Sequence, residues 1–138
     1  MKYLLDTNVI SELQKSNCNE NVKKFISALN WEDLYLSVLT IGELCYGVER
    51  LPHSKKKHEL SIWLHTDLSE WFKGRIIELD TESLIEWGKL RALAERTLSA
   101  VDSLLAASAI VNHMYIVTRN TKDFNDIAGI NLLNPWEF

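Results

Sequence analysis

The chain has 138 residues, 46% of them hydrophobic and 25% charged, which is the balance of a globular protein able to bury one core. Its net charge of −4 and pI near 5.5 argue against binding nucleic acid through a general positive field, but not through a metal and a local basic rim. No stretch approaches the ~20 apolar residues that span a bilayer, and no signal core follows the N-terminus. We therefore expect one cytoplasmic domain over residues 1–138, with no membrane partner.

Apolar runs alternate with segments of helical apolar spacing along the whole chain. In order, they predict a strand over 2–5, helices over 9–13 and 20–29, a strand over 34–39, helices over 40–51 and 58–72, a strand over 75–79, helices over 81–98 and 101–111, and strands over 115–118 and 130–134. The strands lack polar alternation, which is typical of a parallel sheet covered on both faces. We predict a three-layer α/β/α fold with a mostly parallel five-stranded sheet.

Four carboxylates stand where predicted strands end or helices begin. Asp6 follows the first strand directly, Glu43 is predicted in the first turn of the helix after the second, Asp102 opens the helix over 101–111, and Asp123 follows the fourth strand. Parallel sheets bind ligands beyond the carboxyl ends of their strands, so we expect these acids to share one edge.

Each acid also has a simpler alternative role at a helix N-terminus. Thr40–Glu43 and Ser99–Asp102 have capping-box spacing, and Asn120 is a candidate N-cap before Asp123. Two features favour a metal instead. Asp102 opens an otherwise apolar helix with no basic residue within one turn, and four carboxylates at one edge would repel one another. Hard divalent cations such as Mg²⁺ and Mn²⁺ bind such oxygen clusters, and a capping role is compatible with a metal role.

Five segments together carry a family resemblance: "YLLDTNVISEL", "LYLSVLTIGELCYGVERL", "VDSLLAASA", "VTRNTKDF" and "LLNPW". In this order, over essentially the whole length, the chain resembles PIN-domain ribonucleases, and among them the VapC/FitB-type toxins of bacterial toxin–antitoxin pairs. The resemblance assigns the four acids of the family to Asp6, Glu43, Asp102 and Asp123. It assigns the small polar helpers of the family to Thr7, Thr118 and Asn120.

The resemblance also implies an activity: Mg²⁺- or Mn²⁺-dependent hydrolysis of RNA phosphodiester bonds, leaving a 5′-phosphate and a 3′-hydroxyl. Asp6 and Asp102 would be the main metal ligands, Glu43 and Asp123 would complete the site or recruit a second ion, and Glu43 would orient the attacking water. The implied partners are an RNA substrate, a cognate antitoxin that reaches the acidic pocket with a basic residue, and a second copy in a homodimer. The segment "LAERTLSAVD" departs from the family, because it is short and lacks the usual Gly or Pro before the third acid.

Basic and aromatic residues outside these motifs have two interpretations. Arg119 and Lys122 flank Asp123 and are candidate phosphate contacts, whereas "HSKKKH" over 53–58 is either a solvated loop or a second RNA contact. The tryptophans on apolar helix stripes are predicted core residues, with a partner groove as the alternative. They are Trp63, Trp71 and Trp87. We expect the two cysteines to be small buried hydrophobes rather than a disulfide.

Two other protein classes fit parts of the pattern. Asp80 and Thr118 occupy positions like the phosphoacceptor and switch residue of a response-regulator receiver, but the chain lacks an acid beside Asp6 and a lysine after its last strand. A PIN-like module that acts by contact alone is the second alternative. The presence of all four acids argues against it.

Overall fold

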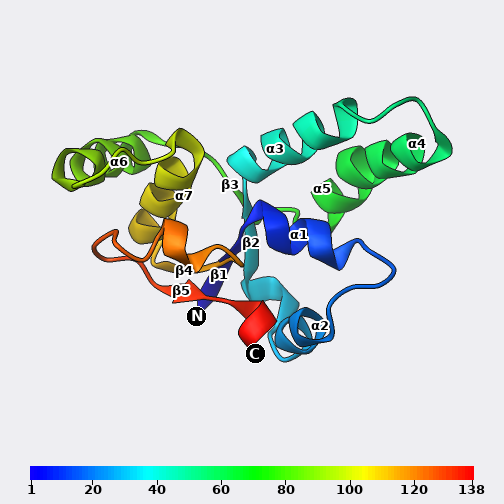
Figure 1. Ribbon diagram of the computed structural model, residues 1–138, viewed down its shortest axis with the longest axis horizontal. Helices are drawn as coiled ribbons and strands as arrows, with labels where there is room; N and C mark the ends of the chain where they lie inside the picture. Colours follow the sequence, from blue (N-terminus) through cyan, green and yellow to red (C-terminus); the bar gives the residue numbers. More distant parts are fainter.

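A computed structural model describes residues 1–138 as one five-stranded sheet between two layers of helices (Figure 1). The strands are β1 (Lys2–Leu5), β2 (Leu34–Ser37), β3 (Ile76–Ile77), β4 (Met114–Val117) and β5 (Leu132–Leu133). All neighbours pair in parallel, in the order β3-β2-β1-β4-β5, which confirms the predicted fold class. This order also excludes the receiver alternative, whose sheet runs 2-1-3-4-5.

Helices cover both faces of the sheet, and each face has its own core. They are α1 (Thr7–Leu13), α2 (Glu20–Ser27), α3 (Val38–Glu49), α4 (Lys55–Ile62), α5 (Leu68–Trp71), α6 (Thr81–Leu93) and α7 (Ala100–Val111). In Figure 1, α6 and α7 lie on one side of the strands and α1, α2, α4 and α5 on the other. Leu5 packs into the core beneath α1–α5, and its neighbour Leu4 into the core beneath α7, because successive side chains of a strand point to opposite faces. Both residues are fully buried, so β1 is held rigidly up to its last residue.

Four short turns complete the fold: η1 (Trp31–Asp33), η2 (Trp63–Asp67), η3 (Thr121–Asp123) and η4 (Pro135–Glu137). Three are 3₁₀ turns, whereas η2 is a π-helical turn between α4 and α5, in which the Leu68 N–H donates to the Trp63 carbonyl. The helix predicted over 58–72 is therefore one helical run with a π turn in it. It begins at Lys55, because the Ser54 hydroxyl accepts a hydrogen bond from the Lys57 N–H and caps its N-terminus.

The strand predicted over 34–39 ends at Ser37, because Ser37 caps α3 through its hydroxyl, which accepts from the Leu39 N–H. Thr40 therefore lies inside α3, and the capping box predicted for Thr40–Glu43 is wrong. Glu43 falls in the second turn of α3 rather than the first.

Two further boundaries differ from the prediction. The strand predicted over 75–79 is paired only at Ile76–Ile77, since it is an edge strand with β2 as its one neighbour. The helix predicted over 81–98 ends at Leu93, which is 82% exposed, because the residues after it have few apolar side chains to pack. The chain from Ala94 to Ser99 then forms an irregular connection with a bend at Glu95 and Arg96.

The tryptophans and cysteines divide between core and surface. Trp71 is 48% exposed, so its prediction as a core residue is wrong, whereas Trp63 is half-buried against the core beneath α1–α5. Trp87 is half-buried and donates its Nε1–H to Ser103 Oγ (2.9 Å). Cys18 and Cys45 are both free thiols. No helix in the protein is long and apolar enough to cross a bilayer.

Candidate active site

Asp6 ends β1 and begins α1, and its carboxylate is held by three donors. Oδ1 accepts from the Thr7 N–H (2.8 Å), and Oδ2 accepts from Thr118 Oγ1 (2.8 Å) and from Asn8 Nδ2 (3.3 Å). Asp6 is only 8% exposed, and burial raises its pKa, with a further rise from the charge of Glu43, although the three donors favour the ionised form. Asp6 therefore caps α1 and is also a fixed, poorly neutralised negative charge.

Thr118, just after β4, is the centre of the network around this carboxylate. While its hydroxyl donates to Asp6, it accepts from Asn8 Nδ2 (3.2 Å) and from the Asn120 N–H (3.1 Å). Asn8 Oδ1 in turn accepts from the Arg119 N–H (3.1 Å), so the ends of β1 and β4 are tied together. Asn120 takes part through its backbone and makes no side-chain capping bond, so its predicted N-cap role is wrong.

We expect Thr118→Val to destabilise the protein by about 1–3 kcal/mol, because buried polar groups on Asp6, Asn8 and Asn120 would lose their shared partner. Thr118 is fully buried, so water cannot replace the hydroxyl without repacking. The free energy of unfolding from urea titration measures the effect. The same substitution at the exposed Thr66 is the matched control, and equal small effects at both sites would contradict the importance of the network.

Glu43 faces the same edge from α3. Its Oε1 accepts a short hydrogen bond from Thr7 Oγ1 (2.6 Å), and Thr7 also gives its backbone N–H to Asp6. Thr7 is therefore the bridge between the first two acids, which makes it more than a helix starter. Glu43 itself is exposed.

Asp102 and Asp123 approach from the other side of the sheet. Asp102 lies in the first turn of α7, where its N–H donates to Ser99 Oγ (3.3 Å), so the predicted Ser99 cap is confirmed. Burial raises the pKa of Asp102, and the charges of Asp6, Asp123 and Glu43 raise it further. Asp123 ends η3, and both it and Asp102 are half-buried. All four acids thus act on one another electrostatically at one edge of the sheet.

The four acids are close enough to repel but do not form a closed ligand cage. No group of three or more His, Cys, Asp or Glu side chains converges tightly enough to hold a metal ion by itself. The donor set is nevertheless all carboxylate oxygen. Burial, and then the charges of neighbouring acids, raise the pKa values of Asp6 and Asp102. These residues fit a hard divalent cation, with water completing its coordination.

Arg96 is a residue of this region that sequence reasoning missed. It lies at a bend in the segment before α7 and makes a two-pronged ion pair with Asp126, from Nε to Oδ2 (2.6 Å) and from Nη2 to Oδ1 (2.9 Å). Nη2 also donates to the carbonyl of Asp123 (2.8 Å). A single arginine in a polar loop has no periodicity, so only the folded structure shows that it meets Asp123.

The candidate phosphate contacts remain exposed. Arg119 lies with its guanidinium over the Trp136 ring (5.1 Å to the centroid), and Lys122 is in η3 beside Asp123. The basic segment 53–58 is partly accounted for by structure, because Lys57 Nζ donates to the carbonyls of Glu49 (3.0 Å) and Leu51 (3.1 Å) and so caps the end of α3. All four histidines are exposed, as expected for residues outside the site.

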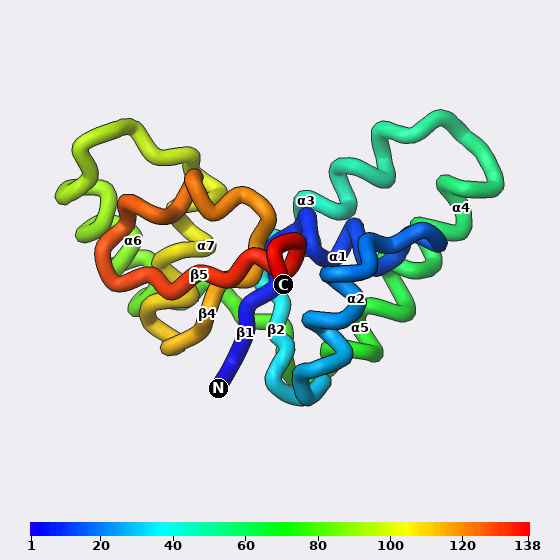
Figure 2. Tube along the Cα trace, turned by 60° about the horizontal axis from the view of Figure 1, so that its bottom comes forward, coloured from blue at the N-terminus to red at the C-terminus, as the bar shows by residue number.

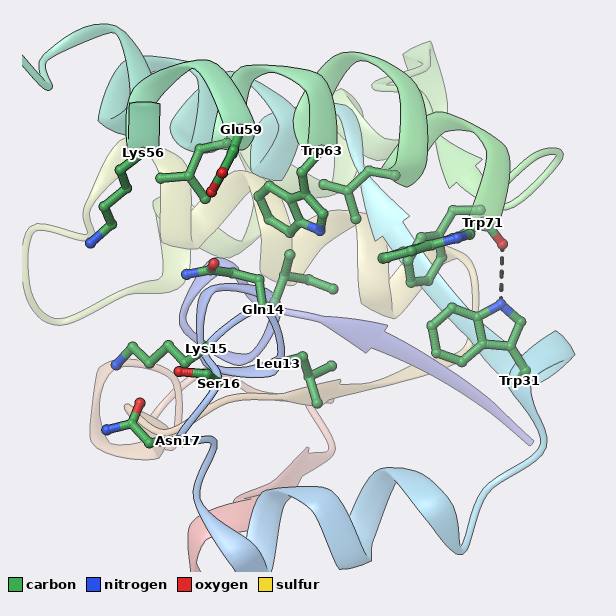
Figure 3. A pocket seen from close by; sticks show the side chains of 14 residues that line it. Leu13, Gln14, Lys15, Ser16, Asn17, Trp31, Lys56, Glu59, Trp63 and Trp71 are labelled. Carbon is green, nitrogen blue, oxygen red and sulfur yellow. Dashed lines mark hydrogen bonds between the residues drawn. The ribbon is translucent and has the colours of Figure 1, made fainter. Parts of the chain in front are cut away.

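Among the hollows on the surface, one adjoins the acids and a larger one lies away from them. A shallow hollow of about 540 Å³ adjoins the site and is lined by Thr7, Glu43 and apolar residues of α3. A larger groove of about 640 Å³ runs between α1 with the segment after it and the α4–η2–α5 helix (Figure 3). None of the four acids lines this groove. Trp31, Trp63 and Trp71 lie along it, and the Trp31 Nε1–H donates to the Trp71 carbonyl (3.1 Å).

Comparison with known proteins places this site in a family. Residues 3–130 match the PIN domain. The chain belongs to the PIN-domain family. This PIN domain is 37% identical over 137 residues to the plasmid stability protein StbB of Pseudomonas syringae pv. tomato, covering 97% of this chain and 98% of that one. It is 33% identical to the VapC ribonuclease Y4jK of Sinorhizobium fredii (97% of each chain) and 36% identical to the toxin FitB of Neisseria gonorrhoeae (96% and 97%).

The structure of this PIN domain is also similar to one solved structure over nearly its full length. The crystal structure of FitAcB from Neisseria gonorrhoeae matches with a TM-score of 0.91 and 35% identity, covering 99% of both chains. The resemblance read from the sequence is thereby confirmed at the level of family and fold.

Proposed function

We propose that this PIN domain is a Mg²⁺- or Mn²⁺-dependent endoribonuclease that acts as the toxin of a toxin–antitoxin pair. The observation that carries the proposal is the edge at which Asp6 and Asp102 have pKa values raised by burial and by neighbouring carboxylates, while none of the four acids is in a salt bridge. Relatives over the whole chain are named as ribonucleases, and one as a toxin, which supports the same activity here.

In this proposal Asp6 and Asp102 hold the divalent cation, and Glu43 and Asp123 complete the site or recruit a second ion. When bound, such a cation makes a water molecule acidic enough to supply hydroxide near neutral pH and offsets charge on the phosphate. Asp6 suits the role of principal ligand because Thr7, Asn8 and Thr118 fix its orientation before any metal arrives.

Glu43 and the basic residues act on the water and on the RNA. Thr7 holds Glu43 Oε1, which leaves Oε2 to orient the attacking water in line with the scissile phosphate. Arg119 and Lys122 are exposed beside the site and contact neighbouring phosphates. No histidine is needed for this route, consistent with the position of all four away from the acids.

The test separates this activity from a PIN-like module that acts by contact alone. We expect excess EDTA to abolish cleavage of RNA by the purified protein, and added Mg²⁺ or Mn²⁺ to restore it, because the acids cannot activate water without the cation. Cleavage is followed on total RNA, with new 5′ ends mapped by sequencing. Undiminished cleavage in excess EDTA would overturn the metal-dependent mechanism, and no cleavage with either metal would favour the contact module.

The groove lined by tryptophans is the surface we propose for the antitoxin. Its floor is apolar and its rim carries Gln14, Lys15, Lys56 and Glu59, a pattern that suits the apolar face of an amphipathic segment with charged flanks. One end of the groove is formed by Ile10 and Leu13 of α1, and α1 begins at Thr7 beside Asp6. Helix α1 is about 10 Å long. An antitoxin segment seated in the groove therefore needs only to run along α1 to bring a basic residue to the four acids.

Self-association is a further part of the proposal. Helix α6 exposes Leu84, Ile85 and Leu93 (42%, 55% and 82% exposed), apolar surface that a second copy would cover. The homodimer follows from the family resemblance.

A further inference from the structure

Arg96 joins two segments that belong to different sides of the candidate site. The first is the connection from α6 to α7, and the second is the chain from η3 onward. Figure 2 shows these two segments side by side, one in yellow-green and the other in orange. Three hydrogen bonds from the one guanidinium connect them: two to the carboxylate of Asp126 and one to the carbonyl of Asp123.

These contacts are poorly suited to a role in overall stability. Arg96 and Asp126 side chains are 43% and 50% exposed, and ion pairs of that exposure add little to the free energy of unfolding. Both segments are already anchored in the core beneath α7, the second by the fully buried Phe124 and the first by the partly buried Leu98. What the guanidinium adds is geometry, because a planar two-pronged pair fixes orientation as well as distance.

The Arg96 guanidinium connects the backbone segments that carry Asp102 and Asp123. Arg96 precedes Ser99, the cap of the helix whose first turn holds Asp102, and it bonds directly to the backbone of Asp123. The negative charges of Asp102 and Asp123 both act on Arg96, which places all three groups in one neighbourhood. No other side chain forms hydrogen bonds to both segments.

We propose that Arg96 is a positioning residue that sets the separation of Asp102 and Asp123, and through it the affinity of this PIN domain for its divalent cation, with Asp126 fixing the guanidinium in place. The inference rests on the proposed function and adds to it a residue that touches neither metal nor RNA. Loss of partners that orient metal-site groups costs about 10–100-fold in metal affinity, so about tenfold is expected here.

The experiment compares the full-length protein with Arg96→Ala, Arg96→Lys and Asp126→Asn. Arg96→Lys keeps the charge but loses the two-pronged geometry, and Asp126→Asn keeps the size but loses the charge of the partner. Lys89→Ala, at an exposed position of α6, removes one positive charge without touching the pair. Calorimetric titration with Mn²⁺ gives the metal affinity, the melting temperature in EDTA gives stability, and RNA cleavage is measured against both Mn²⁺ and RNA concentration.

We expect each of the three variants to weaken Mn²⁺ binding about tenfold, with Lys failing to rescue, while cleavage at saturating Mn²⁺, the KM for RNA and the melting temperature in EDTA stay near those of the wild type. Lys89→Ala should behave as wild type. Unchanged Mn²⁺ affinity, full rescue by lysine, or a rise confined to the KM for RNA would each overturn the inference alone. A wild-type protein that binds no Mn²⁺ would overturn the proposed function, and this inference with it.

Discussion

Replacing Asp102 with asparagine is expected to reduce RNA cleavage by more than about a hundredfold and, at the same time, to stabilise the metal-free protein. Mutation of residues that only orient metal ligands lowers metal affinity or activity about 10–100-fold. Removing a carboxylate ligand itself should cost more, which sets the lower bound on the loss of cleavage. Asparagine has the same shape, and the cap of α7 is kept, because Ser99 accepts from the backbone of residue 102 and not from its side chain. Asp6→Asn is a poorer test, since an amide nitrogen would face the donors on Asn8 or Thr118.

The expected stabilisation of the metal-free protein follows from the raised pKa of Asp102. Burial and the charges of Asp6, Asp123 and Glu43 raise that pKa above the ordinary 3.8, so the neutral form is favoured on folding. The stability that the neutral Asp102 carboxyl contributes is complete at pH values below its pKa in the unfolded chain. This stability is lost as the pH rises through its pKa in the folded protein. At neutral pH and without metal, the ionised group therefore opposes folding, and asparagine should raise the melting temperature by about 1–3 °C, since partial exposure screens the repulsion.

Thermal melts in EDTA and in Mg²⁺, at pH 4 and pH 7.5, measure both parts. The gain of the variant over the wild type should appear at pH 7.5 and shrink at pH 4, which lies just above the unfolded pKa, and Mg²⁺ should raise the melting temperature of the wild type more than that of the variant. A variant that melts below the wild type in EDTA at pH 7.5, or that responds equally to Mg²⁺, would show that Asp102 is not a repelled metal ligand.

Trp71→Ala is expected to free the ribonuclease from its antitoxin while leaving cleavage intact. Trp71 is 48% exposed in the groove although it fits the apolar stripe of its helix, and exposed aromatic anchors dominate the energy of many interfaces. Truncating such an anchor costs about 2 kcal/mol or more, equal to a Kd raised roughly 30-fold or more. Binding of purified cognate antitoxin is measured by calorimetry, and its inhibition by the same RNA cleavage assay.

Phe138→Ala is the control for this experiment, because Phe138 is an aromatic residue that is 60% exposed and does not line the groove. It should leave antitoxin affinity unchanged. An unchanged Kd for Trp71→Ala would show that the antitoxin binds elsewhere, and a loss of cleavage would show that the substitution disturbs the fold.

The sheet and the edge occupied by the acids could be predicted because both depend on local signals. The sequence directly shows apolar strands such as Lys2–Leu5 and the polar residues that follow them. Parallel pairing then places the strand ends together. Capping was harder to predict. Ser37 and Thr40 are both good N-caps, and the choice between them depends on where β2 stops pairing, which the sequence does not encode locally.

The contacts that orient the acids could not be predicted, since they join residues far apart in the chain. Thr118 was expected as a small helper, but its simultaneous bonds to Asp6, Asn8 and Asn120 depend on β4 lying beside β1. Arg96 was not expected at all. Likewise, Trp71 fits the apolar stripe of a helix, and only the packing of α5 shows that its ring is left exposed.

The π turn at Trp63–Asp67 decides which way the aromatic rings of the groove point. In an uninterrupted α-helix, eight residues turn about 800°, which would leave Trp63 and Trp71 about 80° apart around the axis. The π turn takes up one extra residue, so the rotation falls to about 700° and the two rings come within about 20° of each other. A second pair of groove residues repeats this offset, because Leu60 and Leu68 are also eight residues apart across the turn. The direction of the binding face thus depends on the number of residues in the turn, so that substitutions at its exposed positions, His65 and Thr66, are tolerated where a deletion is not.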